Sequence, residues 1–291
     1  MSKVQNKILV PIDFSEQSII ALKQSYNLAR LTRSDILLIY VLDEDFIKSL
    51  EHIFSEKEYE DPVRDLVQAK LDKLAGDVHT ETGVIVNTTI RKGKIYEEIV
   101  NVANEIDAKF IVMGTHGKIG LKKKFLGSNA SRVIKEAHCP VITIKGKEHH
   151  YGCKKIVLPL DLSRETKEKV DKAIELAGFF GSAIYIVSVI ESDDEFLMNK
   201  ITRQMNQVKE IIASGNIPVY TEFVKGGDIP EEIINYAEKI DADLIIIMTQ
   251  QEINWTEMFI GFAAQKIIDE SNIPVLSIRP QLRSIIEFTT S

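Results

Sequence analysis

Cysteine is scarce in this chain, and long hydrophobic runs are missing from it. Cys139 and Cys153 are the two cysteines among 291 residues, and they form no Cys-x-x-Cys pair. A disulfide framework and a structural zinc site are therefore not expected, and both thiols are predicted to be reduced. The apolar runs at 36–42 and 244–248 are far shorter than the roughly 20 residues of a membrane helix. Membrane insertion is thus not expected.

The start of the chain lacks a hydrophobic leader. The segment "MSKVQNKILVPID" runs directly into a strand-like pattern without the apolar core of a signal peptide. We therefore expect a cytoplasmic protein. The net charge of −7 argues against general nucleic-acid binding, which needs a broad basic surface. The composition, 44% hydrophobic and 27% charged, is that of a globular protein.

An internal repeat is the most informative feature of the sequence. "KILVPIDFS" at 7–15 returns as "KIVLPLDLS" at 155–163, and "HCPVITIK" at 138–145 returns as "NIPVLSIR" at 272–279. Residues 91–145 align with 225–279 without a gap, and 21 of these 55 positions are identical. A repeat of this length indicates two copies of one fold.

Each copy alternates strand-like and helix-like patterns. The strand-like runs of the first copy are short and apolar, as in strands buried on both faces; they lie at 8–12, 36–42, 84–90, 110–113 and 141–144. Helical patterns separate them; one begins after Ser15, a favourable cap residue. This alternation predicts an α/β protein with two tandem, doubly wound, five-stranded parallel-sheet domains. The predicted organisation is a first domain at 1–146, a linker at 147–153, a second domain at 154–280 and a tail at 281–291.

The segment "GTHGKIGLKKKFLGS" at 114–128 is the candidate binding element. It follows the strand-like run at 110–113 and ends where a helical pattern begins. Ligands of open parallel sheets bind beyond the carboxyl ends of the strands, and a helix N-terminus suits phosphate. Gly114 and Gly117 would let the backbone approach a ligand, and the Ser128 hydroxyl would donate to a phosphate oxygen. The spacing is neither that of a Walker A loop nor that of a dinucleotide fingerprint.

The spacing Gly-x2-Gly-x9-Gly-Ser after the fourth strand resembles the ATP-binding signature of the universal stress protein family. The opening "ILVPIDFSEQS" and the closing "CPVITIK" look like that family's first and last strands. The resemblance covers nearly the whole chain and implies a Rossmann-like fold of the adenine nucleotide alpha hydrolase type. Family members often pair through their last strands. Residues 141–144 and 275–278 are therefore expected to form an intramolecular pseudo-dimer, and further homo-oligomers are left open.

The resemblance implies an ATP site in the first copy. Asp13 would contact the nucleoside, Val41 would pack on the adenine, and Met113 would line the base or ribose. The phosphates would lie against the glycine segment. The full set of expected binding residues is Pro11, Ile12, Asp13, Val41, Met113, Gly114, Thr115, His116, Gly117, Gly127, Ser128 and Asn129. Mg²⁺ held by the phosphates is compatible with this set, and no side chain is assigned to the metal.

The second copy serves as an internal control for this site. At the positions of Gly114, Gly117 and Ser128 it has Met248, Gln251 and Phe262, whereas Gly127 returns as Gly261 and Asp13 as Asp161. The replacements add bulk and remove a hydroxyl. The sequence therefore predicts one nucleotide site, in the first copy, and a degenerate second copy.

Three functions follow as hypotheses. The first is an ATP-binding stress-response protein whose nucleotide state controls association with a protein partner that the sequence does not identify, with at most slow hydrolysis. The second is a scaffold that binds partners and has a vestigial glycine loop. The third is a slow ATPase or phosphotransferase that uses His116, the titratable side chain of the loop. The lysines at 122–124 are interpreted as a solvated face.

The first copy also has about 14 extra residues between its second and third strands. The acidic, aromatic stretch at 43–62 is the place where they are expected. Two interpretations are open: a lid over the adenine side of the site, or an irregular approach to a helix.

Overall fold

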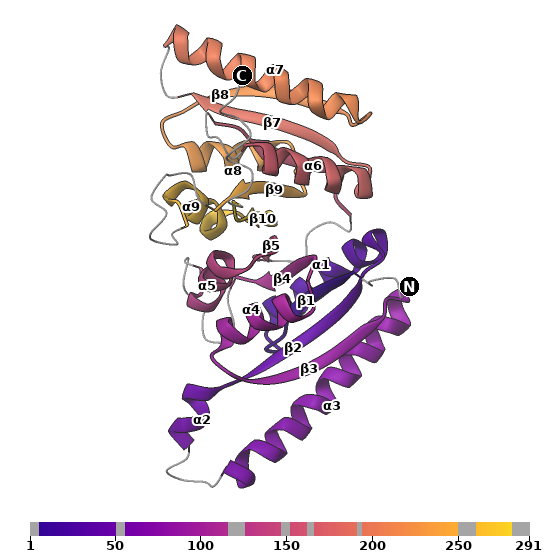
Figure 1. Cartoon of the computed structure of the whole chain (residues 1–291). Coiled ribbons are helices and arrows are strands. Elements are labelled where there is room, and N and C mark those ends of the chain that lie inside the picture. Colours follow the sequence, from indigo (N-terminus) through magenta and orange to yellow (C-terminus); the bar gives the residue numbers. More distant parts are fainter. Residues whose placement is uncertain are drawn as a thin grey trace. The chain divides into compact units, whose positions relative to one another are not determined.

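The computed structural model describes residues 6–50, 56–115, 126–146, 152–161, 166–190, 194–249 and 260–280. The chain divides into two compact units, 1–144 and 145–291. Figure 1 shows the elements in the order of the sequence. The predicted linker falls largely outside the described residues, as does the predicted tail. The pairing of the two copies through their last strands stays a prediction.

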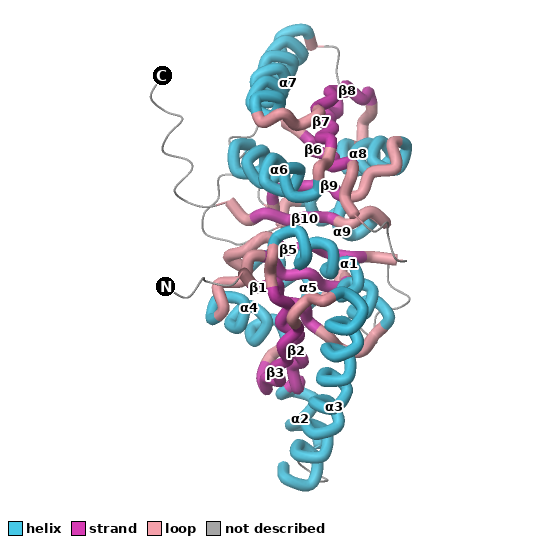
Figure 2. The backbone as a smooth tube through the Cα atoms, turned by 90° about the vertical axis from the view of Figure 1, so that its right-hand side faces the viewer, coloured by secondary structure: helices cyan, strands magenta, loops and turns pink. Residues whose placement is uncertain are grey.

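The first unit is a doubly wound parallel sheet. Its elements are β1 (Lys7–Pro11), α1 (Glu16–Thr32), β2 (Asp35–Asp43), α2 (Glu44–Leu50), α3 (Glu56–Thr82), β3 (Val86–Gly93), α4 (Ile95–Glu105), β4 (Phe110–Gly114), α5 (Ser128–Glu136) and β5 (Val141–Ile144). The strand order is β3-β2-β1-β4-β5, and all neighbours are parallel. Figure 2 shows α1 and α3 on one face of this sheet and α4 on the other. The predicted fold class is thereby confirmed for this unit.

The second unit repeats the architecture. It consists of β6 (Lys155–Pro159), α6 (Thr166–Phe180), β7 (Ala183–Ile190), α7 (Glu195–Ser214), β8 (Val219–Lys225), α8 (Ile229–Lys239), β9 (Leu244–Met248), α9 (Phe262–Glu270) and β10 (Val275–Ile278). Its strand order, β8-β7-β6-β9-β10, is that of the first unit, and the neighbours are again parallel. In both units the order reverses beside the first strand, which creates a switch point between β1 and β4 and between β6 and β9.

Local sequence explains where the elements begin and end. Ser15 caps α1, as predicted, because its side chain accepts a hydrogen bond from the Ser18 N–H at 3.2 Å. The repeated Ile-Asp-Ala ends α4 and α8: Asp107 and Asp241 adopt the left-handed region, with φ of 48° and 53°. Aspartate tolerates this conformation better than most residues.

One expected boundary and one interpretation need correction. The third strand begins at Val86 rather than Val84, because Gly83 has a φ of 71° and the Thr82 hydroxyl accepts from the Val84 N–H at 3.1 Å. These features belong to the end of α3 rather than to a strand. The 43–62 insertion is not an irregular approach to a helix in its described part, which forms α2 and the first turns of α3. Whether the insertion covers a ligand stays a prediction.

Candidate functional site

The described members of the expected site set lie at the carboxyl ends of β1, β2 and β4 and at the start of α5. Pro11 ends β1, Ile12 is buried, and the Ile12 N–H donates to the Ile39 carbonyl of β2 at 2.8 Å. Asp13 follows, half-buried, and its Oδ1 accepts from the Ser15 N–H at 2.9 Å. This bond closes a tight turn that fixes the carboxylate at the switch point of the sheet.

Phe14, the residue after Asp13, stabilises the same turn through contacts of its ring. It adopts a φ of 59°, which is uncommon for an aromatic residue. Its ring lies 5.6 Å from the Tyr40 ring of β2, and the Lys70 ammonium of α3 lies 5.5 Å from the Phe14 ring centroid. The turn that carries Asp13 is therefore braced by β2 and α3. Sequence reasoning assigned no role to Phe14.

Val41 lies near the end of β2 and is half-buried, in register with Arg91 of β3. A half-buried valine at this edge leaves apolar surface available to a planar base. Met113 is 6% exposed, so little of its side chain is accessible to a ligand. The contacts expected of Val41 and Met113 with a nucleotide both stay predictions.

Gly114, the last residue of β4, is required by packing. A Cβ at this position would lie 2.9 Å from the Gln17 Cβ and 3.1 Å from the Gln17 carbonyl carbon and oxygen. These distances are shorter than ordinary van der Waals contact, so the glycine allows α1 to pack directly on β4. Sequence reasoning attributed Gly114 to ligand approach alone and missed this contact.

A backbone hydrogen bond joins the two sides of the glycine segment. The Gly127 N–H donates to the Thr115 carbonyl at 2.9 Å, and the Thr115 N–H donates to the Ile144 carbonyl at 3.0 Å. We call the pairing of Thr115 with Gly127 the clasp. His116 and Gly117, which belong to the expected binding set, lie outside the described residues, as do the lysines at 122–124. The clasp brings the end of β4 to the start of α5.

The N-terminus of α5 is suited to an anion. Gly127 is its N-cap residue and makes no side-chain cap hydrogen bond, and the first turn has no acidic residue. The first N–H groups of a helix without a side-chain cap are donors for a bound anion, and the helix dipole favours negative charge there. Ser128 is exposed and Asn129 is half-buried at this end. Both side chains offer additional donors.

The second unit has the same backbone arrangement with different side chains. The Gly261 N–H donates to the Thr249 carbonyl at 2.8 Å, and the Thr249 N–H donates to the Ile278 carbonyl at 2.9 Å. The clasp is therefore present in both units. At the position of Ser128, however, Phe262 is 82% exposed and offers no hydrogen-bonding group. Asp161 is half-buried, like Asp13.

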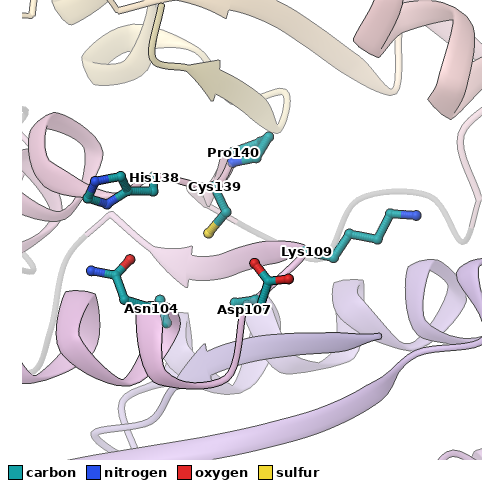
Figure 3. A pocket seen from close by; sticks show the side chains of 8 residues that line it. Asn104, Asp107, Lys109, His138, Cys139 and Pro140 are labelled. Atoms are coloured by element: carbon teal, nitrogen blue, oxygen red, sulfur yellow. The ribbon is translucent and has the colours of Figure 1, made fainter. Parts of the chain in front are cut away.

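A cavity of about 520 Å³ lies at the opposite edge of the first unit. It is formed where α4 and α5 end, before β4 and β5 begin, and Figure 3 shows the Asn104, Asp107 and Cys139 side chains pointing into one space. The cavity lies at the amino ends of β4 and β5, whereas the predicted nucleotide site lies at the carboxyl ends of β1, β2 and β4. This cavity is therefore distinct from the predicted nucleotide site.

The two cysteines differ in their environment. Burial raises the pKa of the Cys153 thiol to about 12, and the neighbouring Asp243 carboxylate contributes to the increase. Cys139 is half-buried beside the cavity. Because the thiolate is the reactive form, Cys153 has almost no reactive fraction at pH 8.

We expect iodoacetamide to alkylate Cys139 in the native protein and to leave Cys153 unmodified, as measured by peptide mass spectrometry. Equal modification of both cysteines without unfolding would contradict this prediction.

The described residues show neither a metal cluster nor a spanning helix. No group of three or more His, Cys, Asp or Glu side chains within the described ranges is arranged to hold a metal ion. Within the same ranges, no helix has the length and apolar character needed to cross a membrane.

The strand order and the clasp in each unit define a tandem, doubly wound α/β protein of the Rossmann-like kind. The model of the universal stress protein family matches residues 5–145 and 152–279. The chain belongs to this family, with one family domain in each unit.

Individual relatives agree with this assignment. The chain is 37% identical over 139 residues to the universal stress protein MJ0531 of Methanocaldococcus jannaschii. The aligned region covers 48% of this chain and 81% of that protein. It is 20% identical over 295 residues to a universal stress protein of Mycolicibacterium smegmatis, covering 96% and 99% of the two chains. A solved universal stress protein from Archaeoglobus fulgidus superposes with a TM-score of 0.77 at 20% identity, covering 96% and 98%. That likeness shows the tandem fold.

Proposed function

We propose that the first unit is an ATP-binding regulatory module and that the second unit is a degenerate copy. The observation that carries this proposal is the difference between two copies of one backbone. The clasp recurs as Thr115–Gly127 and Thr249–Gly261. The helix that follows begins with Ser128 in the first unit and with Phe262 in the second. At this helix position a hydroxyl suited to phosphate is thus present in the first unit and replaced by an aromatic ring in the second.

The residues of the first unit suit the parts of a nucleotide. The N-terminus of α5, with Ser128 and Asn129, would hold phosphate oxygens. The Asp13 carboxylate would accept hydrogen bonds from ribose hydroxyls, and Val41 would pack on the base. Mg²⁺ would neutralise the phosphates, which are its usual ligands in such sites. In this proposal the nucleotide state controls association with a protein partner, and hydrolysis is slow or absent.

Calorimetric titration of ATP with Mg²⁺ into the full chain tests the proposal. We expect one ATP per chain, because the second unit lacks the phosphate-facing side chains. Asp13→Ala should weaken binding about tenfold or more, since a hydrogen bond to a charged group contributes about 1.5–3 kcal/mol. Any nucleotide that co-purifies with the protein is first removed and identified.

Asp161→Ala provides the matched control, because Asp161 follows β6 as Asp13 follows β1. Its ATP affinity should equal that of the wild type. An absence of ATP binding in the wild type would overturn the proposal and favour a scaffold with a vestigial loop. A stoichiometry of two would show that the second unit is not degenerate.

A further inference from the structure

A cluster of charged side chains lies where α4 packs against α5. The Arg132 guanidinium carbon of α5 lies 4.6 Å from the centroid of the Tyr96 ring of α4. The Tyr96 hydroxyl donates to Glu97 Oε1 at 2.7 Å, and the Lys94 ammonium donates to the same oxygen at 3.1 Å. Lys94 and Arg132 are both exposed. We call these four residues the basic cluster.

The basic cluster lies at the same edge of the sheet as the predicted nucleotide site. Arg132 follows Ser128 by four residues, so both lie on one face of α5, one turn apart. Helical side chains lean toward the N-terminus, which directs Arg132 toward the turn of Ser128. Lys94 directly follows the carboxyl end of β3 and precedes α4.

Lys94 is an unusual residue for its position. It is the N-cap of α4 and makes no side-chain cap hydrogen bond. Lysine cannot accept from the free N–H groups, and its positive charge opposes the helix dipole. Its local partner is Glu97, in an exposed ion pair of 3.1 Å that contributes little to stability. Capping and stability therefore do not account for a lysine here, which points to a functional role.

In the second unit, the residue that corresponds to Lys94 has a structural role. This residue, Asp228, caps α8 by accepting from the Glu231 N–H at 3.1 Å. The other oxygen of Asp228 pairs with the Lys266 ammonium at 2.5 Å. Lys266 is the equivalent of Arg132 in the repeat. The cation on α9 is thus neutralised by the helix cap in the copy that lacks the phosphate-facing serine.

We propose that Lys94 and Arg132 form a basic subsite for the terminal phosphates of the nucleotide, so that the first unit selects polyphosphates over monophosphates. The exchange of aspartate for lysine at this position changes the local charge by two units. Glu97 holds the Lys94 ammonium in the absence of ligand and is displaced from it by a phosphate oxygen. The inference rests on the proposed function, since it requires a nucleotide on the N-terminus of α5.

Lys94→Asp introduces the residue of the second unit and tests the subsite. ATP, ADP and AMP are each titrated into the wild-type and variant full chains. We expect the variant to lose about tenfold in ATP affinity, the size of one lost charge-assisted hydrogen bond. Its AMP affinity should stay within about twofold of the wild type, because a monophosphate does not reach the cluster.

The thermal unfolding midpoint separates this role from a structural one. The aspartate of the Lys94→Asp variant would cap α4, so the midpoint should stay equal or rise while ATP affinity falls. Arg132→Gln, which keeps much of the side-chain length, should reproduce the selective loss for ATP. Lys209→Asp, on the exposed side of α7 in the second unit, makes the same change in net charge and should leave all three affinities unchanged.

Several outcomes would overturn the subsite. Equal loss of ATP and AMP affinity in Lys94→Asp, or an unchanged ATP affinity, would show that Lys94 is not part of the subsite. A similar loss of ATP affinity in Lys209→Asp would show that the effect comes from the net charge of the protein and not from the subsite. A wild-type chain that binds none of the three nucleotides would instead overturn the proposed function, and the subsite with it.

Discussion

Gly114→Val is expected to abolish ATP binding and to lower the free energy of unfolding of the first unit by about 1–3 kcal/mol or more. A Cβ at this position lies 2.9 Å from the Gln17 Cβ and 3.1 Å from its carbonyl group. The nearest obstacles include backbone atoms of α1, which cannot rotate away. Helix α1 must therefore shift, and the turn that carries Asp13 shifts with it.

Hydrogen–deuterium exchange with mass spectrometry measures the stability of each unit separately, and calorimetry measures binding. Gly76→Ala is the control, because Gly76 lies inside α3 with no atom within 4 Å of an added Cβ. That substitution should stabilise the unit by up to about 1 kcal/mol through helix propensity. Wild-type stability and binding in Gly114→Val would show that α1 does not pack on β4 as described.

Phe110→Ala is expected to destabilise the first unit by about 3–5 kcal/mol. Phe110 begins β4, is 0% exposed and is in register with Ile8 of β1. Its removal leaves a cavity in the buried core beside the start of β4. Increased exchange should therefore spread over β1 and β4, while the second unit keeps its protection.

The repeat supplies the conservative variant for this position. Leu244 begins β9 where Phe110 begins β4. Phe110→Leu keeps most of the apolar volume and should cost less than about 1.5 kcal/mol. The prediction for Phe110 fails if the alanine and leucine variants are equally stable.

The sequence was sufficient to predict the fold, because two kinds of evidence agreed. Buried strands such as Ile8–Val10 and Ile111–Val112 are continuous apolar runs, and helix starts such as Ser15 carry their caps in the sequence. The repeat then supplied a second copy of the sequence pattern for most elements. The extension of β3 to Gly93 was not predictable, since Arg91 and Lys92 are polar and pair with α4 and α3 through side chains.

The location of the candidate site stays a prediction from the sequence, and the contacts around it were not predictable. The glycines and Ser128 gave the location, because their spacing is local in the chain. The packing of Gly114 on Gln17 and the meeting of Tyr96 with Arg132 join residues that are distant in sequence. Comparing the copies position by position would have exposed one further signal, the lysine at 94 where the second copy has Asp228.

The clasp determines which sequence changes the two units can accommodate. Thr115 and Gly127 meet through backbone atoms, and so do Thr249 and Gly261. In both units eleven residues separate the two partners. A bond made by the main chain places no demand on the side chains between its ends. The sequences between the partners can therefore differ while the pairing stays the same, as residues 116–126 and 250–260 do.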